Sequence, residues 1–321
     1  MRLPSNATLN ATVVALGSLL CAAPAAAQDY PTKPLNMVIP FPPGGNTDLM
    51  ARALQPELAK ALGQPVVVVN KGGAGGTIGD IEVANARPDG YTIGLTPNNP
   101  LTAQPHIQKL PYDMASFRYV CLTYDVPYVL IASPKAPFAT FAEFMAFAKA
   151  KNDNLIYASP GPGTQPHLGI LAVLSAIKAE GVHVPFTGAG PMSQAMLAGT
   201  VMAMAESPAV AKASNLKVLA ALAKTRIAAL PDVPTMMEAG LKDFEVVNYF
   251  ALFAPPKTPA AVAQRLRDEI AQAVAAPDMI EQFAKQGMTP VANQPAEFAK
   301  HLQAELERWA QVIKDAGIKP E

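Results

Sequence analysis

The chain has 321 residues, half of them hydrophobic and only 16% charged, with 25 basic side chains against 25 acidic ones. This composition favours a globular protein with a large core over a disordered chain. The even charge balance, without any basic run, excludes a surface that attracts nucleic acid or anionic lipid.

The N-terminal segment has the pattern of a secretory signal peptide. Arg2 precedes an apolar run, and small residues before position 28 form an A-x-A cleavage site. The apolar run is shorter than the roughly 20 residues that span a bilayer, which argues against a membrane anchor. Lipidation at Cys21 is a minor alternative, because the residues just before it are bulky. We expect removal of residues 1–27, with cleavage after Ala27, and a periplasmic protein whose single remaining cysteine, Cys121, forms no internal disulfide.

Beyond residue 27, short β-branched runs alternate with amphipathic stretches, which predicts an α/β fold. The first helix, 49–62, is expected to kink at Pro56 or to divide into two shorter helices, because proline removes a backbone hydrogen bond. Two later helices, 260–275 and 295–316, are interpreted as scaffold. The predicted strands cover 35–40, 66–69, 92–95, 129–132, 156–159, 218–221 and 250–254.

The length after residue 27 exceeds the usual size of one domain, so we expect two lobes. Two apolar segments are candidates for the connections between them, and they place a hinge near 123–128 and 248–251. The predicted lobes are therefore 28–124 plus 251–321, and 125–250.

Two glycine-rich loops, 41–48 and 160–165, each follow a predicted strand and open a predicted helix. Glycine lets the backbone approach a ligand, and free N–H groups at a helix start attract an anion. Each loop by itself is as consistent with an ordinary turn as with binding. Their occurrence in both lobes, at the carboxyl ends of strands, favours a shared anion-binding cleft.

The sequence lacks the motifs of common enzyme classes. Residues 73–79 read G-x-G-x-x-x-G, but no acidic residue ends the next strand, so we interpret this loop as structural or cleft-lining. No P-loop or G-x-S-x-G elbow is present. Cys121 lies in an apolar strand, which favours an inert thiol. We predict no catalysis, cofactor or metal site, because metal-ligand spacing is absent from the four histidines, His106, His167, His183 and His301.

Several spaced motifs together resemble the Bug family, the substrate-binding proteins of tripartite tricarboxylate transporters. The resemblance runs from Tyr30 to the C-terminal helix. The motifs that carry it lie at 30–34, 40–48, 62–68, 88–92, 110–113 and 230–235.

The resemblance implies a two-lobed type II periplasmic-binding-protein fold, with a mixed sheet in each lobe and flanking helices. It also implies a monomer that binds a small carboxylate and delivers it to membrane permease subunits. A receptor that presents the bound acid to a membrane sensor is the alternative. The ligand-binding residues carried over are Pro43, Gly45, Asn46, Thr47 and Asp48 from the first loop, Asn98 and Asn99, and Ser159, Gly161, Gly163, Thr164 and His167 from the second loop. For His167 a structural hydrogen bond is an equal alternative.

Departures from the family pattern bear on the ligand. Phe186 lacks a hydroxyl, Thr187 replaces the usual lysine, and Glu206 stands near a position that often carries an aspartate. Prolines in the loops suggest a stiff and less polar pocket. We therefore expect an aromatic, terephthalate-like carboxylate rather than citrate or an amino acid. Phe186 and Tyr249 are candidate ring contacts, with an ordinary place in the core as the alternative for each.

Overall fold

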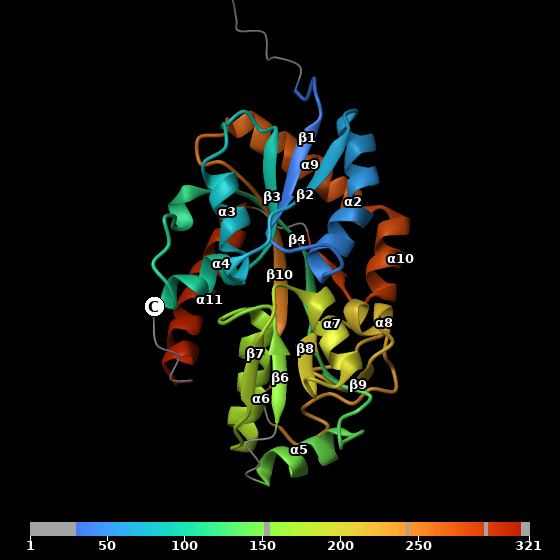
Figure 1. The fold of residues 1–321 in the computed structure, drawn as a ribbon. Helices are drawn as coiled ribbons and strands as arrows, with labels where there is room; N and C mark the ends of the chain where they lie inside the picture. The colour runs from blue at the N-terminus through green and yellow to red at the C-terminus, as the bar shows by residue number, and fades with distance from the viewer. Residues whose placement is uncertain (1–29, 151–154, 242–243, 292–294, 316–321) are drawn as a thin grey trace, which may run out of the picture.

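The computed structural model describes residues 30–150, 155–241, 244–291 and 295–315. The expected signal peptide, 1–27, lies outside them. The chain forms two α/β lobes, one above the other, each built on a mixed sheet (Figure 1). Among the helices described, none combines the length and apolar character needed to cross a membrane.

The upper sheet has the strand order β11-β4-β10-β3-β1-β2. β1 pairs in parallel with β2 and β3, whereas β10 runs antiparallel to β3 and β4. The parallel strands β1, β2 and β3 alternate with helices along the chain. The carboxyl ends of these three strands therefore meet at the edge of the sheet that faces the lower lobe. The strand bounds of the whole sheet are β1 Leu35–Ile39, β2 Val66–Asn70, β3 Thr92–Pro97, β4 Arg118–Pro127, β10 Val247–Ala254 and β11 Thr289–Pro290.

The helices of the upper lobe pack on this sheet. α2 buries Met50, Leu54 and Leu58 and ends at Gly63, whose φ of 65° closes the helix in the left-handed region. It is one helix through Pro56, so the expected division into two helices is wrong, and its buried apolar face offsets the lost hydrogen bond. The helical segments are α2 Asn46–Leu62, η2 Ala74–Gly76, α3 Thr77–Ala84, α4 Asn99–Thr102, η3 Gln104–His106, η4 Met114–Ser116, α9 Ala260–Ala275, α10 Pro277–Lys285 and α11 Pro295–Asp315.

The lower sheet has the order β7-β6-β8-β5-β9. β6 is parallel to β7 and β8, and β5 is antiparallel to β8 and β9, so this sheet is mixed as well. The elements are β5 Val129–Ala132, α5 Phe141–Lys149, β6 Ile156–Ser159, α6 Gln165–Ile177, β7 Val182–Pro185, α7 Ala189–Ala198, β8 Ala203–Glu206, α8 Pro208–Ala213 and β9 Lys217–Ala221.

The chain crosses between the sheets at two adjacent points. Tyr128 separates β4 from β5, and Val246 precedes β10. The amide of Tyr128 donates a hydrogen bond to the carbonyl of Val246 at 3.1 Å. The amide of Leu222 donates to the carbonyl of Tyr128, and the amide of Val246 donates to the carbonyl of Leu222, each at 2.8 Å. This pair of crossings lies beside the predicted hinge segments, and the predicted lobe bounds remain our proposal for the bodies that move.

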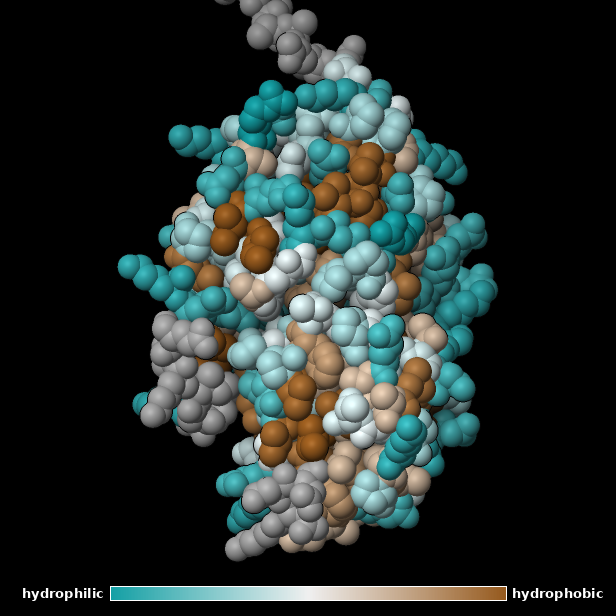
Figure 2. Space-filling model, in the orientation of Figure 1, coloured by the Kyte–Doolittle hydropathy of each residue, from teal (hydrophilic) through white to brown (hydrophobic). Residues whose placement is uncertain are grey.

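Apolar side chains on the outer surface are dispersed. Figure 2 shows separate hydrophobic patches on each lobe, surrounded by hydrophilic residues. The large apolar side chains that are most exposed, including Val67, Ile78 and Val182, come from different elements. The largest apolar cluster runs through both lobes and includes Tyr128 at the crossing, and a further cluster lies within each lobe.

Candidate functional site

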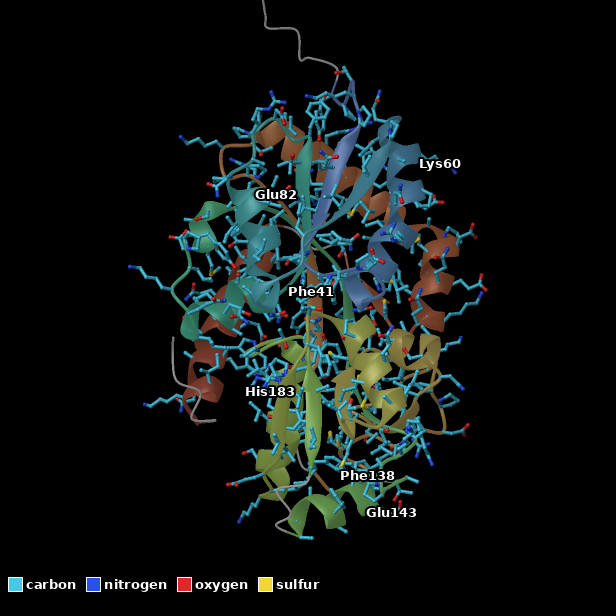
Figure 3. The ribbon with its side chains drawn as sticks, viewed as in Figure 1. Phe41, Lys60, Glu82, Phe138, Glu143 and His183 are labelled. Carbon is cyan, nitrogen blue, oxygen red and sulfur yellow. The ribbon has the colours of Figure 1, made fainter. Side chains whose placement is uncertain are left out.

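A narrow cleft with a cavity volume of about 30 Å³ lies between the lobes. Figure 3 shows Phe41, one of its lining residues, at the junction of the lobes. Both glycine-rich loops contribute to the lining, together with both crossings between the sheets. The lining residues are Phe41, Gly45, Asn46, Thr47, Pro97, Asn99, Tyr128, Pro160, Thr164, Pro166, Ala189, Glu206, Asn248 and Phe250.

The N-terminus of α2 offers unpaired polar groups to the cleft. Asn46 is 5% exposed, and neither its amide nitrogen nor its amide oxygen has a hydrogen-bond partner among the described residues. The N-cap residue Gly45 supplies no side-chain acceptor to the first backbone N–H groups of the helix. A buried amide without partners costs free energy, so this site is prepared for polar atoms of a ligand.

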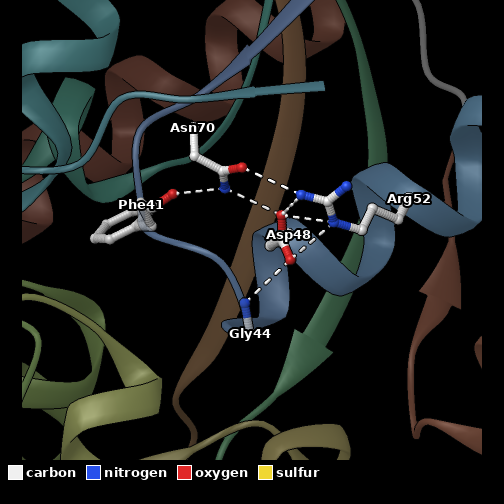
Figure 4. Close-up of polar contacts among 5 residues, drawn as sticks. All are labelled: Phe41, Gly44, Asp48, Arg52 and Asn70. Atoms are coloured by element: carbon white, nitrogen blue, oxygen red, sulfur yellow. Dashed lines mark hydrogen bonds and ion pairs between the residues drawn. The ribbon is translucent and has the colours of Figure 1, made fainter. Parts of the chain in front are cut away.

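Asp48 has a different task, because it fixes the loop that carries these groups (Figure 4). Its carboxylate accepts hydrogen bonds from the Gly44 amide at 3.0 Å, from Asn70 at 3.0 Å and from Arg52 at 3.0 Å and 3.1 Å. Asn70 also donates to the carbonyl of Phe41 at 3.0 Å. Burial alone would raise the pKa of Asp48, but these hydrogen bonds outweigh it and lower the pKa. Asp48 is therefore a permanent anion behind the loop rather than a lining residue.

The loop of the lower lobe is held by its own backbone and side chains. Thr164, which lines the cleft, donates from its hydroxyl to the Gly161 carbonyl at 2.7 Å. The Ser159 hydroxyl lies behind the loop and donates to the same carbonyl at 2.9 Å. These bonds keep the N-terminus of α6 directed at the cleft, where Pro166 in the first turn has no N–H to satisfy.

A third helix N-terminus, that of α7, completes the cleft. Ala189 lines it, and the N-cap residue Gly188 has no side chain to accept from the first N–H groups. In the described part of the chain, the lining contains no lysine or arginine. Three helix N-termini, rather than a cation, therefore provide the positive potential for an anion.

Acceptors face the cleft as well. Glu206 is 5% exposed, and its carboxyl accepts from the Ser207 amide at 2.5 Å. Burial raises the pKa of Glu206 to about 7. Asn248 donates to the Tyr128 hydroxyl at 2.7 Å, while its amide oxygen has no partner among the described residues. The cleft thus combines donors for an anion with a carboxyl that is neutral below pH 7.

The sequence model of one protein family, described as the tripartite tricarboxylate transporter family receptor, matches residues 50–318 of this chain. The chain belongs to this receptor family. Among solved structures, the periplasmic binding protein BugD is 33% identical, with a TM-score of 0.86, over 91% of this chain and 100% of BugD. MatC from Rhodopseudomonas palustris with bound malate is 32% identical, with a TM-score of 0.82, over 88% and 100% of the two chains. R. palustris Rpa4515 with adipate is 27% identical, with a TM-score of 0.87, over 91% of this chain and 100% of Rpa4515.

These comparisons confirm the resemblance to the Bug family and the two-lobed fold. The relatives are solute-binding receptors rather than enzymes.

The receptor's cleft gathers only part of the set of residues predicted from the sequence. Gly45, Asn46, Thr47, Asn99, Thr164 and Glu206 line it. The other predicted residues lie beside or behind the lining, namely Pro43, Asp48, Asn98, Ser159, Gly161, Gly163, His167, Phe186 and Tyr249. The predicted site residues did not include the remaining lining residues, namely Phe41, Pro97, Tyr128, Pro160, Pro166, Ala189, Asn248 and Phe250. For Asn248 and Phe250, the alternation along β10 would have given a signal once Tyr249 is placed on the opposite face.

Two of the residues beside the cleft are partly buried and pack against the apolar core. Phe186 packs against the apolar cluster of the lower lobe. The ring of Tyr249 packs edge-on against His301, with centroids 4.3 Å apart. These contacts fit the alternative of ordinary packing for each ring.

His167 supports the lower loop from behind. Its Nδ1 accepts from the Gly163 amide at 3.1 Å, and its ring stacks on that of His183 with centroids 4.0 Å apart. His183 in turn bonds to the Ser159 hydroxyl at 2.6 Å. Burial and the neighbouring His183 lower the pKa of His167 to about 3, and burial lowers that of His183 to about 4.

This histidine pair predicts acid sensitivity. Between about pH 6.5, the ordinary histidine pKa, and pH 4, the unfolded chain binds protons that the two folded histidines refuse, so this pair makes the free energy of unfolding fall as pH falls. Glu206, whose pKa is raised to about 7 by burial, contributes a slope of opposite sign, so the histidine contribution is the difference between the wild type and a histidine variant. The slope is at most about 1.4 kcal/mol per pH unit for each histidine, less for the partly exposed His183. Urea unfolding at pH 7, 6 and 5 measures it. His183→Gln is expected to flatten the dependence, and an unchanged slope in that variant would contradict the assignment.

Proposed function

We propose that this protein is a periplasmic solute-binding protein that closes on a small carboxylate and, as a monomer, delivers it to the permease subunits of a tripartite tricarboxylate-type transporter. The observation that carries the proposal is the convergence of three helix N-termini, with the unpaired amide of Asn46, on one cleft without a cation. This geometry suits an anion that backbone N–H groups can surround. The malate and adipate on the two relatives support the ligand class.

We further propose that the body of the ligand is apolar and aromatic. Three aromatic side chains line the cleft beside its polar residues, namely Phe41, Tyr128 and Phe250, and three prolines and Ala189 add further apolar surface. Aromatic walls favour a flat apolar ligand through burial and ring contacts. Adipate on Rpa4515 supports an apolar body between two carboxylates.

A thermal-shift panel of terephthalate, benzoate, adipate, malate and citrate tests this function. At a concentration 100 times its Kd, a ligand stabilises the folded state by about 2.7 kcal/mol, which raises Tm by about 5–10 °C in a protein of this size. We expect the largest shift from terephthalate or benzoate. A shift with citrate alone would contradict the aromatic ligand, and no shift with any acid would contradict the carboxylate class.

Glu206 predicts a pH dependence of binding for a dicarboxylate. Below pH 7 its neutral carboxyl can donate a hydrogen bond to the second carboxylate of the ligand, whereas above pH 7 the ionised form repels it. The neutral fraction falls about tenfold between pH 6 and pH 8, so Kd for terephthalate is expected to rise about tenfold. Calorimetric titration measures it. Glu206→Gln is expected to remove the dependence, and a wild-type Kd that is constant over this range would refute the role.

A further inference from the structure

The C-terminal helix α11 contacts both lobes. Its buried side chains follow helical spacing and form one inward face. In its first half, Phe298 and Leu302 are fully buried against apolar residues of the upper lobe. The ring of Phe298 packs edge-on against that of Tyr119, with ring centroids 5.4 Å apart. In its second half, Trp309 and Ile313 are each 3% exposed and pack in one cluster with Leu168 of α6. Figure 1 shows this end of α11 beside the lower lobe.

Trp309 is attached to the upper lobe by hydrogen bonds. Its indole N–H donates to Glu305 Oε2 at 3.0 Å, and the same oxygen accepts from Asn98 Nδ2 at 3.3 Å. Glu305 Oε1 accepts from Arg308 at 3.1 Å, so this buried carboxylate is fully engaged. Asn98 directly precedes Asn99 in the cleft lining. The indole is therefore fixed relative to the upper lobe, while the apolar cluster to which it belongs also contains Leu168 of the lower lobe.

Other contacts on the same side of the cleft also join the lobes. Gln104 of η3 donates to the Pro162 carbonyl of the lower loop at 2.8 Å. Gly163 lies so close to the Ile107 side chain that a Cβ there would overlap it. Ile107 belongs to the same apolar cluster as Trp309 and Leu168. Separation of the lobes would break this group of contacts together and expose Trp309 and Leu168 to water.

We infer that Trp309, Ile313 and Leu168 set ligand affinity without touching the ligand, because their contact favours the closed arrangement of the lobes. The inference rests on the proposed function. Closed protein binds the ligand, so the apparent Kd rises in proportion as the closed fraction falls. Apolar contact of fully buried side chains is a sufficient source for such a bias. These are positioning residues, since they act through the lobes and not on the ligand.

The chain offers a matched pair of substitutions. Leu168 and Leu302 are both fully buried leucines, but Leu168 packs in the cluster between the lobes and Leu302 packs inside the upper lobe. Both Leu168→Ala and Leu302→Ala are expected to lower Tm. Only Leu168→Ala is expected to raise Kd for terephthalate and adipate, by about tenfold, whereas Leu302→Ala should leave it within about twofold.

Trp309 is the single tryptophan, so its fluorescence reports on this contact directly. In unliganded protein, acrylamide quenching of Trp309 is expected to increase at least about twofold in Leu168→Ala and to stay unchanged in Leu302→Ala. Equal quenching in both variants, or an unchanged Kd in Leu168→Ala, would overturn the inference. If no acid binds the wild type while quenching still rises in Leu168→Ala, the proposed function fails and the contact between the lobes stands.

Discussion

Gly188→Ala is expected to weaken ligand binding about 30-fold, the equivalent of about 2 kcal/mol, while the unliganded protein stays folded. A Cβ on Gly188 would lie 2.6 Å from Pro42 Cγ and 3.0 Å from Pro42 Cδ. Gly188 precedes α7 of the lower lobe, and Pro42 lies in the glycine-rich loop of the upper lobe. The overlap therefore arises only when the lobes close.

The backbone at Gly188 tolerates a side chain. Its φ of 164° is extended, so alanine meets no local strain, and the overlap is relieved by partial opening. Gly190→Ala is the matched control, because its Cβ would meet the Pro43 carbonyl oxygen at an ordinary 3.8 Å. Titration calorimetry and Tm measurements on both variants test the idea. A normal Kd in Gly188→Ala would show that the ligand-bound lobes are farther apart at this point.

Much of the fold follows from local sequence pattern. Every predicted strand is present, because runs such as Val66–Asn70 and Val129–Ala132 are rich in β-branched residues, which favour strands. Four strands were missing from the predicted ranges, namely β4, β7, β8 and β11. β8, Ala203–Glu206, has small and unbranched side chains that carry no such signal. α10 was missed as well, although its apolar residues Met279 and Phe283 are spaced four apart.

The site was predictable where it depends on local backbone and not where it depends on the meeting of the lobes. The two glycine-rich loops indicate helix N-termini, and those of α2 and α6 face one cleft. Tyr128 and Asn248 line the cleft only because the two crossings between the sheets lie side by side, which is a tertiary fact. Asp48 has a local signal for its actual role, since Arg52 follows it by one helical turn and pairs with it.

Under the proposed function, two electrostatic features of the cleft would select its ligand. The positive ends of three helices attract an anion without the hydrated charge of a lysine, so the walls can remain apolar. In this proposal, Glu206 would accept a ligand carboxylate while its own carboxyl is neutral and would repel it once ionised. Both features are consequences of burial, which strengthens dipoles and raises the pKa of a carboxyl.

Asn46→Asp is expected to weaken binding of a dicarboxylate by at least about 100-fold. The substitution places a second negative charge at the N-terminus of α2, in a side chain that is 5% exposed and beside the proposed position of the ligand carboxylate. No cation lines the described cleft to offset the repulsion. Two like charges at close range in a partly desolvated site repel by several kcal/mol.

In the absence of ligand the new charge meets opposing effects. The helix dipole stabilises a carboxylate in the first turn by about 0.3–1 kcal/mol, whereas burial and the anionic Asp48 in the same turn destabilise it. Tm of unliganded Asn46→Asp is therefore measured beside Kd, and a folded variant with a cooperative transition separates lost affinity from lost folding. Asn46→Ala is the control for the amide alone, with an expected loss of about tenfold from its missing hydrogen bonds. Equal losses in the two variants would mean that the ligand carboxylate lies away from α2, at the N-terminus of α6 or α7.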